Sequence, residues 1–195
     1  MLDWVGRVFV ERIETVSVTV KYVVFETSWG YFALAGTTTG LVRTLLPVAS
    51  FGRARADVLK SFPNAQYDPE LLGELQEQIA AYFRGEKVEF EQCPRVVLAG
   101  LSPFAKSVLR ACREVKYGQT ITYGRLAKTV GRPAAARAVG AVLAGNPLPL
   151  VIPCHRVIRS DGNTGGFSAA GGVALKKRLL ALEKACLRCL AACSS

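Results

Sequence analysis

Apolar and polar residues alternate with a period of two over the first quarter of the chain, as they do in a half-buried β-strand. The alternating apolar positions are Val16, Val18, Val20, Tyr22 and Val24. Turn signals at Gly30 and residues 36–40 separate this run from further β-forming clusters at 29–32 and 41–46. Residues 4–46 are therefore predicted to form an antiparallel meander of three or four strands.

The pattern then changes to a helical period. Helices are predicted over 53–61 and 69–84, and Gly85 ends the second one. The apolar stripe of the second helix consists of Leu71, Leu72, Leu75, Ile79 and Phe83. Residues 1–92 contain no obvious catalytic group, so this part of the chain is interpreted as a scaffold.

A linker over 87–101 leads to a third helix. Ser102 is suited to cap it and Pro103 to occupy its first position, and Tyr117-Gly118 stops it. Its apolar stripe consists of Phe104, Val108, Ala111, Cys112 and Val115.

Two short helices follow, at 122–130 and 134–144, joined by the tight turn 131–133. This arrangement is typical of a helix-turn-helix. One face of the second helix holds Ala135, Ala138, Val139, Val142 and Leu143. The opposite face holds Arg137, Gly140, Ala141 and Ala144. One arginine among small residues permits close approach to a partner and suits a narrow groove; the alternative is an Ala-rich helix with one solvated arginine.

The last helix is predicted over 173–192. Its stripe holds Lys176, Leu179, Leu180, Glu183, Leu187 and Leu190. A carboxylate among leucines is costly to bury without a partner. A hydrogen bond from His155 would supply that partner and fix the tautomer of the ring. The alternative is that Glu183 is solvated at the helix edge beside Lys184 or Arg188, although neither lies three or four residues away.

These elements predict an α/β (α+β) chain. Residues 1–92 form a small antiparallel sheet with helices, and a linker extends to about residue 101. Residues 102–195 form a mainly helical domain that contains the helix-turn-helix. With 195 residues, half of them hydrophobic, the chain can bury one large core or two small ones.

The net charge of +10 is concentrated in one half. Residues 1–92 hold 9 Lys/Arg and 12 Asp/Glu, a net charge of −3, whereas 93–195 hold 16 Lys/Arg and 3 Asp/Glu, a net charge of +13. Such an imbalance favours contact with a polyanion, and nucleic acid is the first candidate. A solvated basic surface without a partner is the alternative.

The sequence also limits the compartment. It contains no run of 18 apolar residues, so no membrane span is expected, and its N-terminus lacks the pattern of a secretory signal. Six cysteines in a chain of this length do not make a disulfide scaffold, which favours a reducing compartment. We therefore expect a cytoplasmic monomer, associated with the nucleoid in a prokaryote.

Candidate chemistry is concentrated where an apolar run, interpreted as a strand, ends in Pro153, Cys154, His155 and Arg156. The reactive form of cysteine is the thiolate, which basic and cationic neighbours favour. Adjacent residues need not touch, so His155 is expected to reach Cys154 through a bound water or a bend in the chain. A buried structural cysteine beside a core histidine is the alternative.

Two further features near this run are ambiguous. Asn146 is suited to cap a turn, or to join the turn to the cysteine segment through an amide that both donates and accepts. Cys186, Cys189 and Cys193 lack a second ligand pair, so they are interpreted as packing or tail residues rather than a metal site.

The motifs around Cys154 carry a family resemblance. They read Ala136-Arg137-Ala138-Val139-Gly140, Gly145-Asn146-Pro147 and Pro153-Cys154-His155-Arg156-Val157-Ile158. In these motifs the chain resembles the O6-alkylguanine-DNA alkyltransferases, also called methylated-DNA–protein-cysteine methyltransferases. The resemblance covers about 103–183, whereas residues 1–92 resemble the N-terminal domain of the family only in general layout.

The resemblance implies a suicide reaction on double-stranded DNA, bound through its minor groove, in which an alkyl group moves from O6 of a flipped guanine to Cys154. It makes His155 the base, oriented by Glu183, and Tyr123 the proton donor toward N3 of the leaving guanine. It also makes Asn146 a brace beside the site and places Arg137 in the gap left by the flipped nucleotide.

The resemblance further implies DNA contacts from Thr122, Arg125, Ala136, Arg137, Gly140 and Ala144. It implies a base pocket bordered by Val157, Phe167, Ser168 and Lys176, with the Val157 carbonyl reading the exocyclic amine. Phe167 stands where many members have tyrosine, so only stacking is expected there. Neither a cofactor nor the zinc site of some relatives is expected, since His155 is the only histidine and no cysteine precedes Cys93.

Three other functions compete with alkyl transfer. A non-enzymatic relative that binds alkylated bases and recruits repair factors would lack the cysteine. A helix-turn-helix regulator would present polar base-reading side chains. A cysteine hydrolase would need an oxyanion hole and would turn over repeatedly.

Overall fold

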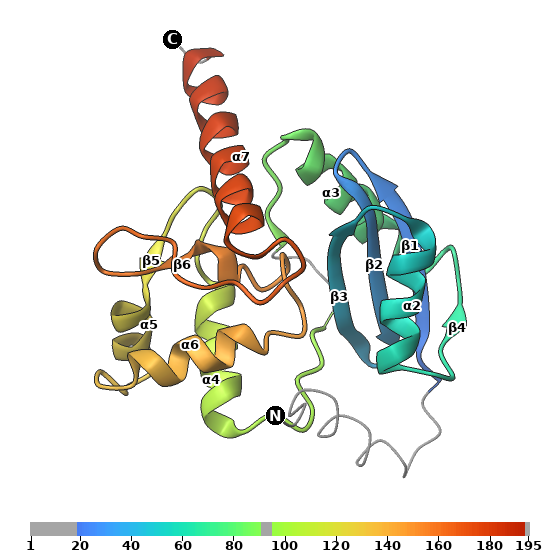
Figure 1. Cartoon of the computed structure of the whole chain (residues 1–195), viewed down its shortest axis with the longest axis horizontal. Coiled ribbons are helices and arrows are strands. Elements are labelled where there is room, and N and C mark those ends of the chain that lie inside the picture. The colour runs from blue at the N-terminus through green and yellow to red at the C-terminus, as the bar shows by residue number, and fades with distance from the viewer. Residues whose placement is uncertain (1–18, 91–94, 194–195) are drawn as a thin grey trace.

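The computed structural model describes residues 19–90 and 95–193. A sheet flanked by helices forms one side of the molecule and a mainly helical part forms the other (Figure 1). The sheet contains β1 (Lys21–Thr27), β2 (Gly30–Thr37), β3 (Gly40–Val48) and β4 (Gln66–Tyr67), in the order β3-β2-β1-β4. The first three strands are antiparallel, as predicted, whereas β4 pairs parallel to β1. Val16 and Val18 lie outside the described residues.

The two faces of the sheet pack against different helices. Helix α2 (Phe51–Ser61) covers one face in a small apolar cluster that includes Val24, Ala54 and Val58. Helix α3 (Gly73–Arg84) packs on the other face, where Leu34 and Ile79 belong to the main core.

Helix α3 begins one turn later than the predicted start at residue 69. The Asp68 carboxylate accepts a hydrogen bond from the Glu70 N–H, which holds a turn there, and Leu72 has a left-handed φ of 57°. Gly85 ends the helix with a φ of 94°, as predicted.

The second part of the chain begins with α4 (Pro103–Arg113), which Ser102 caps as predicted by accepting from the Ala105 N–H. Helices α5 (Tyr123–Thr129) and α6 (Ala136–Ala144) then pack together as the predicted helix-turn-helix. Gly131 lies in the turn between them with a φ of 71°.

Helix α6 buries a narrower face than the sequence predicts. Val139 and Leu143 are buried and Arg137 is exposed, as expected. Ala138, which was expected on the apolar face, is exposed because it lies beside Arg137 at the rim of the packed stripe. The solvent-facing surface of α6 is therefore lined mainly by small residues.

The segment around Cys154 is not the expected strand. A single 3-10 turn, η2 (Cys154–Arg156), carries the cysteine, and the preceding run makes only an isolated bridge between Pro149 and Ile152. After the turn, β6 (Val157–Ile158) pairs parallel with β5 (Ile121–Thr122), which immediately precedes α5.

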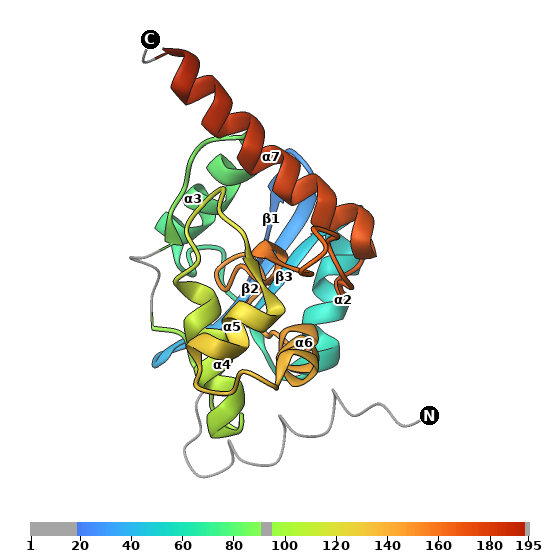
Figure 2. The same cartoon turned by 90° about the vertical axis from the view of Figure 1, so that its left-hand side faces the viewer.

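Helix α7 (Gly172–Cys193) crosses the molecule and its last turns extend beyond the body (Figures 1 and 2). Lys176, Leu179 and Glu183 are fully buried, as their stripe predicts. Leu190, expected on the same stripe, is 47% exposed because the sheet and the other helices do not reach the last turns.

One hydrophobic core joins both parts. Phe32 and Tyr82 from the first part belong to the same buried cluster as Leu126 and Leu179 from the second. The division into domains at residues 92–102 therefore stays a prediction. No helix within 19–90 or 95–193 is long and apolar enough to cross a membrane.

Hydrogen bonds from β3 also connect the two parts. The Thr44 N–H donates to the Pro147 carbonyl at 3.0 Å, and the Thr44 hydroxyl donates to the Pro149 carbonyl at 2.7 Å. These bonds fix the position of the loop that leads to Cys154.

Candidate active site

Asn146 holds the turn that carries Cys154. Its side-chain Nδ2 donates to the Ile152 carbonyl at 2.8 Å, and its Oδ1 accepts from the Leu148 N–H at 3.0 Å. The Cys154 N–H also donates to the Ile152 carbonyl, at 2.8 Å. Of the two interpretations of Asn146, the structure therefore contains the one in which its amide joins the turn to the cysteine segment.

The Cys154 side chain is a thiol at rest. Burial raises its pKa, and a hydrogen bond from Asn146 and the positive charge of Lys176 oppose that rise without cancelling it. Because the thiolate is the nucleophile, a buried thiol needs a base nearby in order to react.

His155 is the residue predicted to be that base. Its Nε2 lies 2.8 Å from Glu183 Oε1, so the predicted contact is present, and both side chains are almost fully buried. Burial lowers the pKa of His155 in spite of the neighbouring carboxylate. The ring is therefore neutral near pH 7 and donates its Nε2–H to Glu183, which leaves the basic lone pair on Nδ1.

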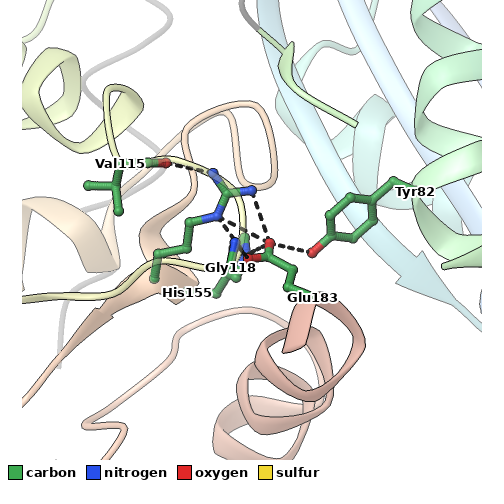
Figure 3. Close-up of polar contacts among 6 residues, drawn as sticks. Tyr82, Val115, Gly118, His155 and Glu183 are labelled. Atoms are coloured by element: carbon green, nitrogen blue, oxygen red, sulfur yellow. Dashed lines mark hydrogen bonds and ion pairs between the residues drawn. The ribbon is translucent and has the colours of Figure 1, made fainter. Parts of the chain in front are cut away.

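Glu183 accepts hydrogen bonds from three further groups, which are Tyr82, Gly118 and Arg156 (Figure 3). The Tyr82 hydroxyl donates to Oε1 at 2.8 Å, and the Gly118 N–H donates to Oε2 at 2.8 Å. Burial alone would raise the pKa of Glu183, but the hydrogen bonds and charges of His155 and Arg156 lower it to about 2. The carboxylate is thus ionised whenever the protein is folded near neutral pH.

Arg156 neutralises the Glu183 carboxylate. Its Nε lies 3.1 Å from both carboxylate oxygens and its Nη2 lies 3.0 Å from Oε1. Its Nη1 donates to the Val115 carbonyl at 2.6 Å, and its guanidinium lies over the Tyr117 ring. A buried ion pair with this many partners is specific in geometry, and the loss of either member is costly.

A second polar group lies close enough to Cys154 for its charge to act on the thiol. Lys176 is fully buried and its Nζ donates to the Val157 carbonyl at 2.6 Å and to the Tyr123 hydroxyl at 3.4 Å. Burial lowers the pKa of Lys176 and raises that of Tyr123. The structure therefore brings Tyr123, Val157 and Lys176 together, although the Val157 carbonyl already accepts a bond from Lys176.

The loop after β6 closes over the end of α6. The Ser168 hydroxyl donates to the Ala144 carbonyl at 2.6 Å, and Phe167 is half-buried against the main core. Both residues lie in the loop between β6 and the start of α7, and their place at the border of a base pocket stays a prediction.

The helix-turn-helix presents a basic surface. Arg125, Lys128, Arg132 and Arg137 are all exposed, and residues 121–145 contain no acid. The remaining predicted contact residues lie on the same module: Ala144 is exposed, whereas Thr122, Ala136 and Gly140 are half-buried. The Thr122 hydroxyl caps α5 by accepting from the Arg125 N–H at 3.1 Å.

Comparison with known proteins agrees with this arrangement. The model of the 6-O-methylguanine DNA methyltransferase DNA-binding domain matches residues 103–185. The methylated-DNA–protein-cysteine methyltransferase of Methanosarcina acetivorans is 37% identical over 167 residues, which cover 85% of this chain and 99% of the relative. The chain belongs to this methyltransferase family.

Other members show similar agreement in sequence and in fold. The methylated-DNA–protein-cysteine methyltransferase of Mycolicibacterium paratuberculosis is 43% identical over 60% of this chain and 68% of its own length. The crystal structure of Mycobacterium tuberculosis O6-methylguanine methyltransferase superposes with a TM-score of 0.70 at 32% identity, covering 86% of this chain and 94% of that one. A structure of the same bacterium's OGT in complex with DNA matches equally well, with a TM-score of 0.70.

Two residues of the site in this methyltransferase were missed from sequence. The sequence predicts Arg156 only as a cationic neighbour that favours the Cys154 thiolate, whereas the structure pairs it with Glu183. A cation directly before Val157 and Ile158 is a signal of such a buried ion pair. Tyr82 lies outside the matched DNA-binding domain and gave no signal, because a tyrosine on an amphipathic helix is typical of the core.

Cys186 and Cys189 take no part in the site. Cys186 is half-buried and packs against the main core, Cys189 is exposed, and both are free thiols. Cys93 and the side chain of Cys193 lie outside the described residues.

Proposed function

We propose that this methyltransferase repairs DNA by moving the alkyl group of O6-alkylguanine irreversibly onto Sγ of Cys154, once per molecule. The observation that supports this best is the buried His155–Glu183 pair beside the buried Cys154, on a turn that the pairing of β6 with β5 connects to the basic helix-turn-helix. The site gathers a protonated nucleophile, a neutral base and a fixed carboxylate, which is the set that nucleophilic catalysis by cysteine requires.

The reaction begins with proton transfer. His155 takes the Cys154 proton through a water at Nδ1, while Glu183 stabilises the imidazolium that forms. The thiolate attacks the alkyl carbon, so that the S–C bond forms as the bond from that carbon to O6 breaks. The electron pair passes to the guanine, and Tyr123 donates a proton toward N3, which makes the base a better leaving group. The product is a thioether that water does not readily hydrolyse, so the protein is consumed.

Access to the buried sulfur requires the guanine to leave the duplex. We infer that α6 enters the minor groove, since its small outer residues suit a narrow groove, and that Arg137 fills the vacated space. Flipping a base costs a few kcal/mol, which stacking of the guanidinium offsets in part. Phe167, Ser168 and Lys176 would then border the flipped base, and the protein would act as a monomer because these site residues lie in one chain.

Mass spectrometry tests the proposal. The protein is mixed with a duplex that carries one O6-methylguanine, and its intact mass and peptides are measured. We expect one added methyl per molecule, located on the peptide that contains Cys154. Cys154→Ser should gain none, whereas Cys189→Ser, which changes an exposed cysteine outside the site, should react like the unaltered protein. Tight binding without methyl gain would instead indicate a protein that only binds damaged DNA.

A further inference from the structure

Tyr82 projects its hydroxyl from the core of the sheet side into the candidate active site. It lies on α3, is fully buried, and its ring packs against the rings of Phe83, Phe90 and Tyr117. Its hydroxyl leaves this apolar packing and donates to Glu183 across a separation of 101 residues along the chain (Figure 3). Buried hydroxyls are normally hydrogen-bonded, but here the partner is a carboxylate that also holds the proposed base.

The phenol and the imidazole share one oxygen atom. Tyr82 Oη and His155 Nε2 each lie 2.8 Å from Glu183 Oε1. We propose that Tyr82 is a positioning residue for alkyl transfer: its hydroxyl fixes the Glu183 carboxylate and weakens the hold of that carboxylate on the proton of His155. This inference rests on the proposed function and deepens it, because it gives a residue of α3, in the part interpreted as a scaffold, a role in positioning the groups that react.

The direction of the effect follows from charge. Each donor on Oε1 draws electron density from that oxygen, so the field that stabilises an imidazolium becomes weaker. The charged groups that face His155 are Glu183 and Lys176 of α7 and Arg156 of its own turn. Of these, only Glu183 favours the protonated ring, so reducing its effect keeps His155 neutral and able to accept the proton of Cys154.

Tyr82 can play this part across the working pH range. Burial raises the pKa of Tyr82 well above its usual value, and the charge of Glu183 raises it further. The phenol therefore remains protonated and donates wherever the protein is folded.

A single histidine makes the inference directly measurable. His155 is the only histidine in the chain, so every imidazole resonance in an NMR titration belongs to it. In Tyr82→Phe, which keeps the ring packing and removes the donor, we expect the pKa of His155 to rise by about 0.5. Replacing Tyr82 by a fluorinated tyrosine, whose more acidic phenol is a stronger donor, should lower it.

The matched control is Tyr117→Phe. Tyr117 is buried beside Tyr82, but its hydroxyl makes no hydrogen bond to Glu183. This variant should leave the His155 titration within about 0.2 of the unaltered protein. Near-ultraviolet circular dichroism establishes that each variant is folded.

The rate of methyl transfer gives a second measurement. In Tyr82→Phe, the acid limb of the pH–rate profile should move to higher pH by the same amount as the pKa of His155 rises. The affinity for DNA should change by less than about twofold. A lower rate without movement of the titration or of the acid limb would overturn the inference and leave Tyr82 a packing residue. If the unaltered protein transfers no methyl group, the proposed function fails, while the NMR titration still decides what Tyr82 does to His155.

Discussion

Glu183 connects three functions in one carboxylate: it neutralises Arg156, orients His155 and closes the turn at Gly118. A carboxylate that binds a cation so closely is a weak competitor for the proton of His155. The ring can therefore remain neutral although it is buried, and the resting Cys154 is a thiol. In the proposed reaction, activation of the nucleophile thus depends on proton transfer to His155 rather than on a permanently ionised cysteine.

The free energy of unfolding should decrease in two steps as the pH is lowered. The pKa of His155 lies below its ordinary value of 6.5 when folded, so stability is lost as the pH falls below 6.5. The pKa of Glu183 falls from 4.5 to about 2 on folding, so a further loss of about 3 kcal/mol occurs between those values. Urea unfolding at a series of pH values measures both steps.

The control for the first step is His155→Gln. This variant should show little change in unfolding free energy between pH 7 and pH 5.5. A smaller second step should remain, because Arg156 still lowers the pKa of Glu183 whereas the contribution of His155 is lost. An equally steep decline in both proteins over the upper range would assign that loss to other groups.

The residues of the site differ in how far sequence could predict them. Glu183 was recognisable because an acid among leucines needs a partner and the chain offers one histidine. Arg156 was within reach of the same reasoning. Tyr82 was not, because nothing local separates a tyrosine that donates to a distant carboxylate from one that fills the core, and only the packing of α3 against α7 brings the two together.

Among the elements, the turn at Gly118 joins α4 to β5 under tight constraints. Its φ is 72°, and a Cβ there would overlap Leu187 of α7. Gly118→Ala should therefore lower the unfolding free energy by about 1–3 kcal/mol, because alanine is strained at this φ and the Leu187 side chain must move to make room for it.

Gly124→Ala is the matched control for that substitution. Gly124 lies in α5 with open space around its Cα, so alanine should be neutral or stabilise by about 0.5 kcal/mol. Chemical unfolding of both variants compares them directly, and equal losses would contradict the role assigned to the Gly118 turn.

The position of Arg137 on α6 leads to a separate prediction about methyl transfer from duplex DNA. Arg137→Ala should slow methyl transfer from duplex DNA by about tenfold or more, because about 1.4 kcal/mol of lost stacking in the flipped state is enough for that factor. Transfer from free O6-benzylguanine, which needs no flipping, should be unchanged. Arg188→Ala, at the exposed far end of α7, controls for the loss of one positive charge. Equal slowing with both substrates would contradict the flipping role.

The pattern of the sequence predicted the elements better than their edges. The capped start of α4 and the end of α3 at Gly85 were predictable from local chemistry. The later start of α3 depends on the turn at Asp68, and the 3-10 turn at Cys154 depends on bonds from Asn146 and Thr44. An apolar run alone does not distinguish that turn from a strand.

At the scale of the whole molecule, the two parts share one core and several specific contacts. Beside the bonds of Thr44, Trp29 of the sheet side lies 3.7 Å from the Arg178 guanidinium of α7. Because each part covers apolar surface of the other, neither is expected to remain folded when its partner unfolds.

We therefore predict one cooperative unfolding transition. Tryptophan fluorescence, to which Trp29 contributes, and far-ultraviolet circular dichroism, which reports mainly the helices, should give the same urea midpoint. Two separate midpoints would show that the parts unfold independently and would favour the predicted boundary near residues 92–102 as a physical one.

The pairing of β5 with β6 has a consequence for how such a protein can vary. Ile121 lies opposite Val157 and Thr122 opposite Ile158, so the residue before α5 is fixed to the chain just after the cysteine turn. The distance from the helix-turn-helix to the Cys154 sulfur is set by this short ladder rather than by the length of the intervening chain. Insertions in the exposed turn around Gly131 would therefore leave the distance between the helix-turn-helix and Cys154 unaltered. The surface of the helix-turn-helix can thus vary in sequence without moving the cysteine.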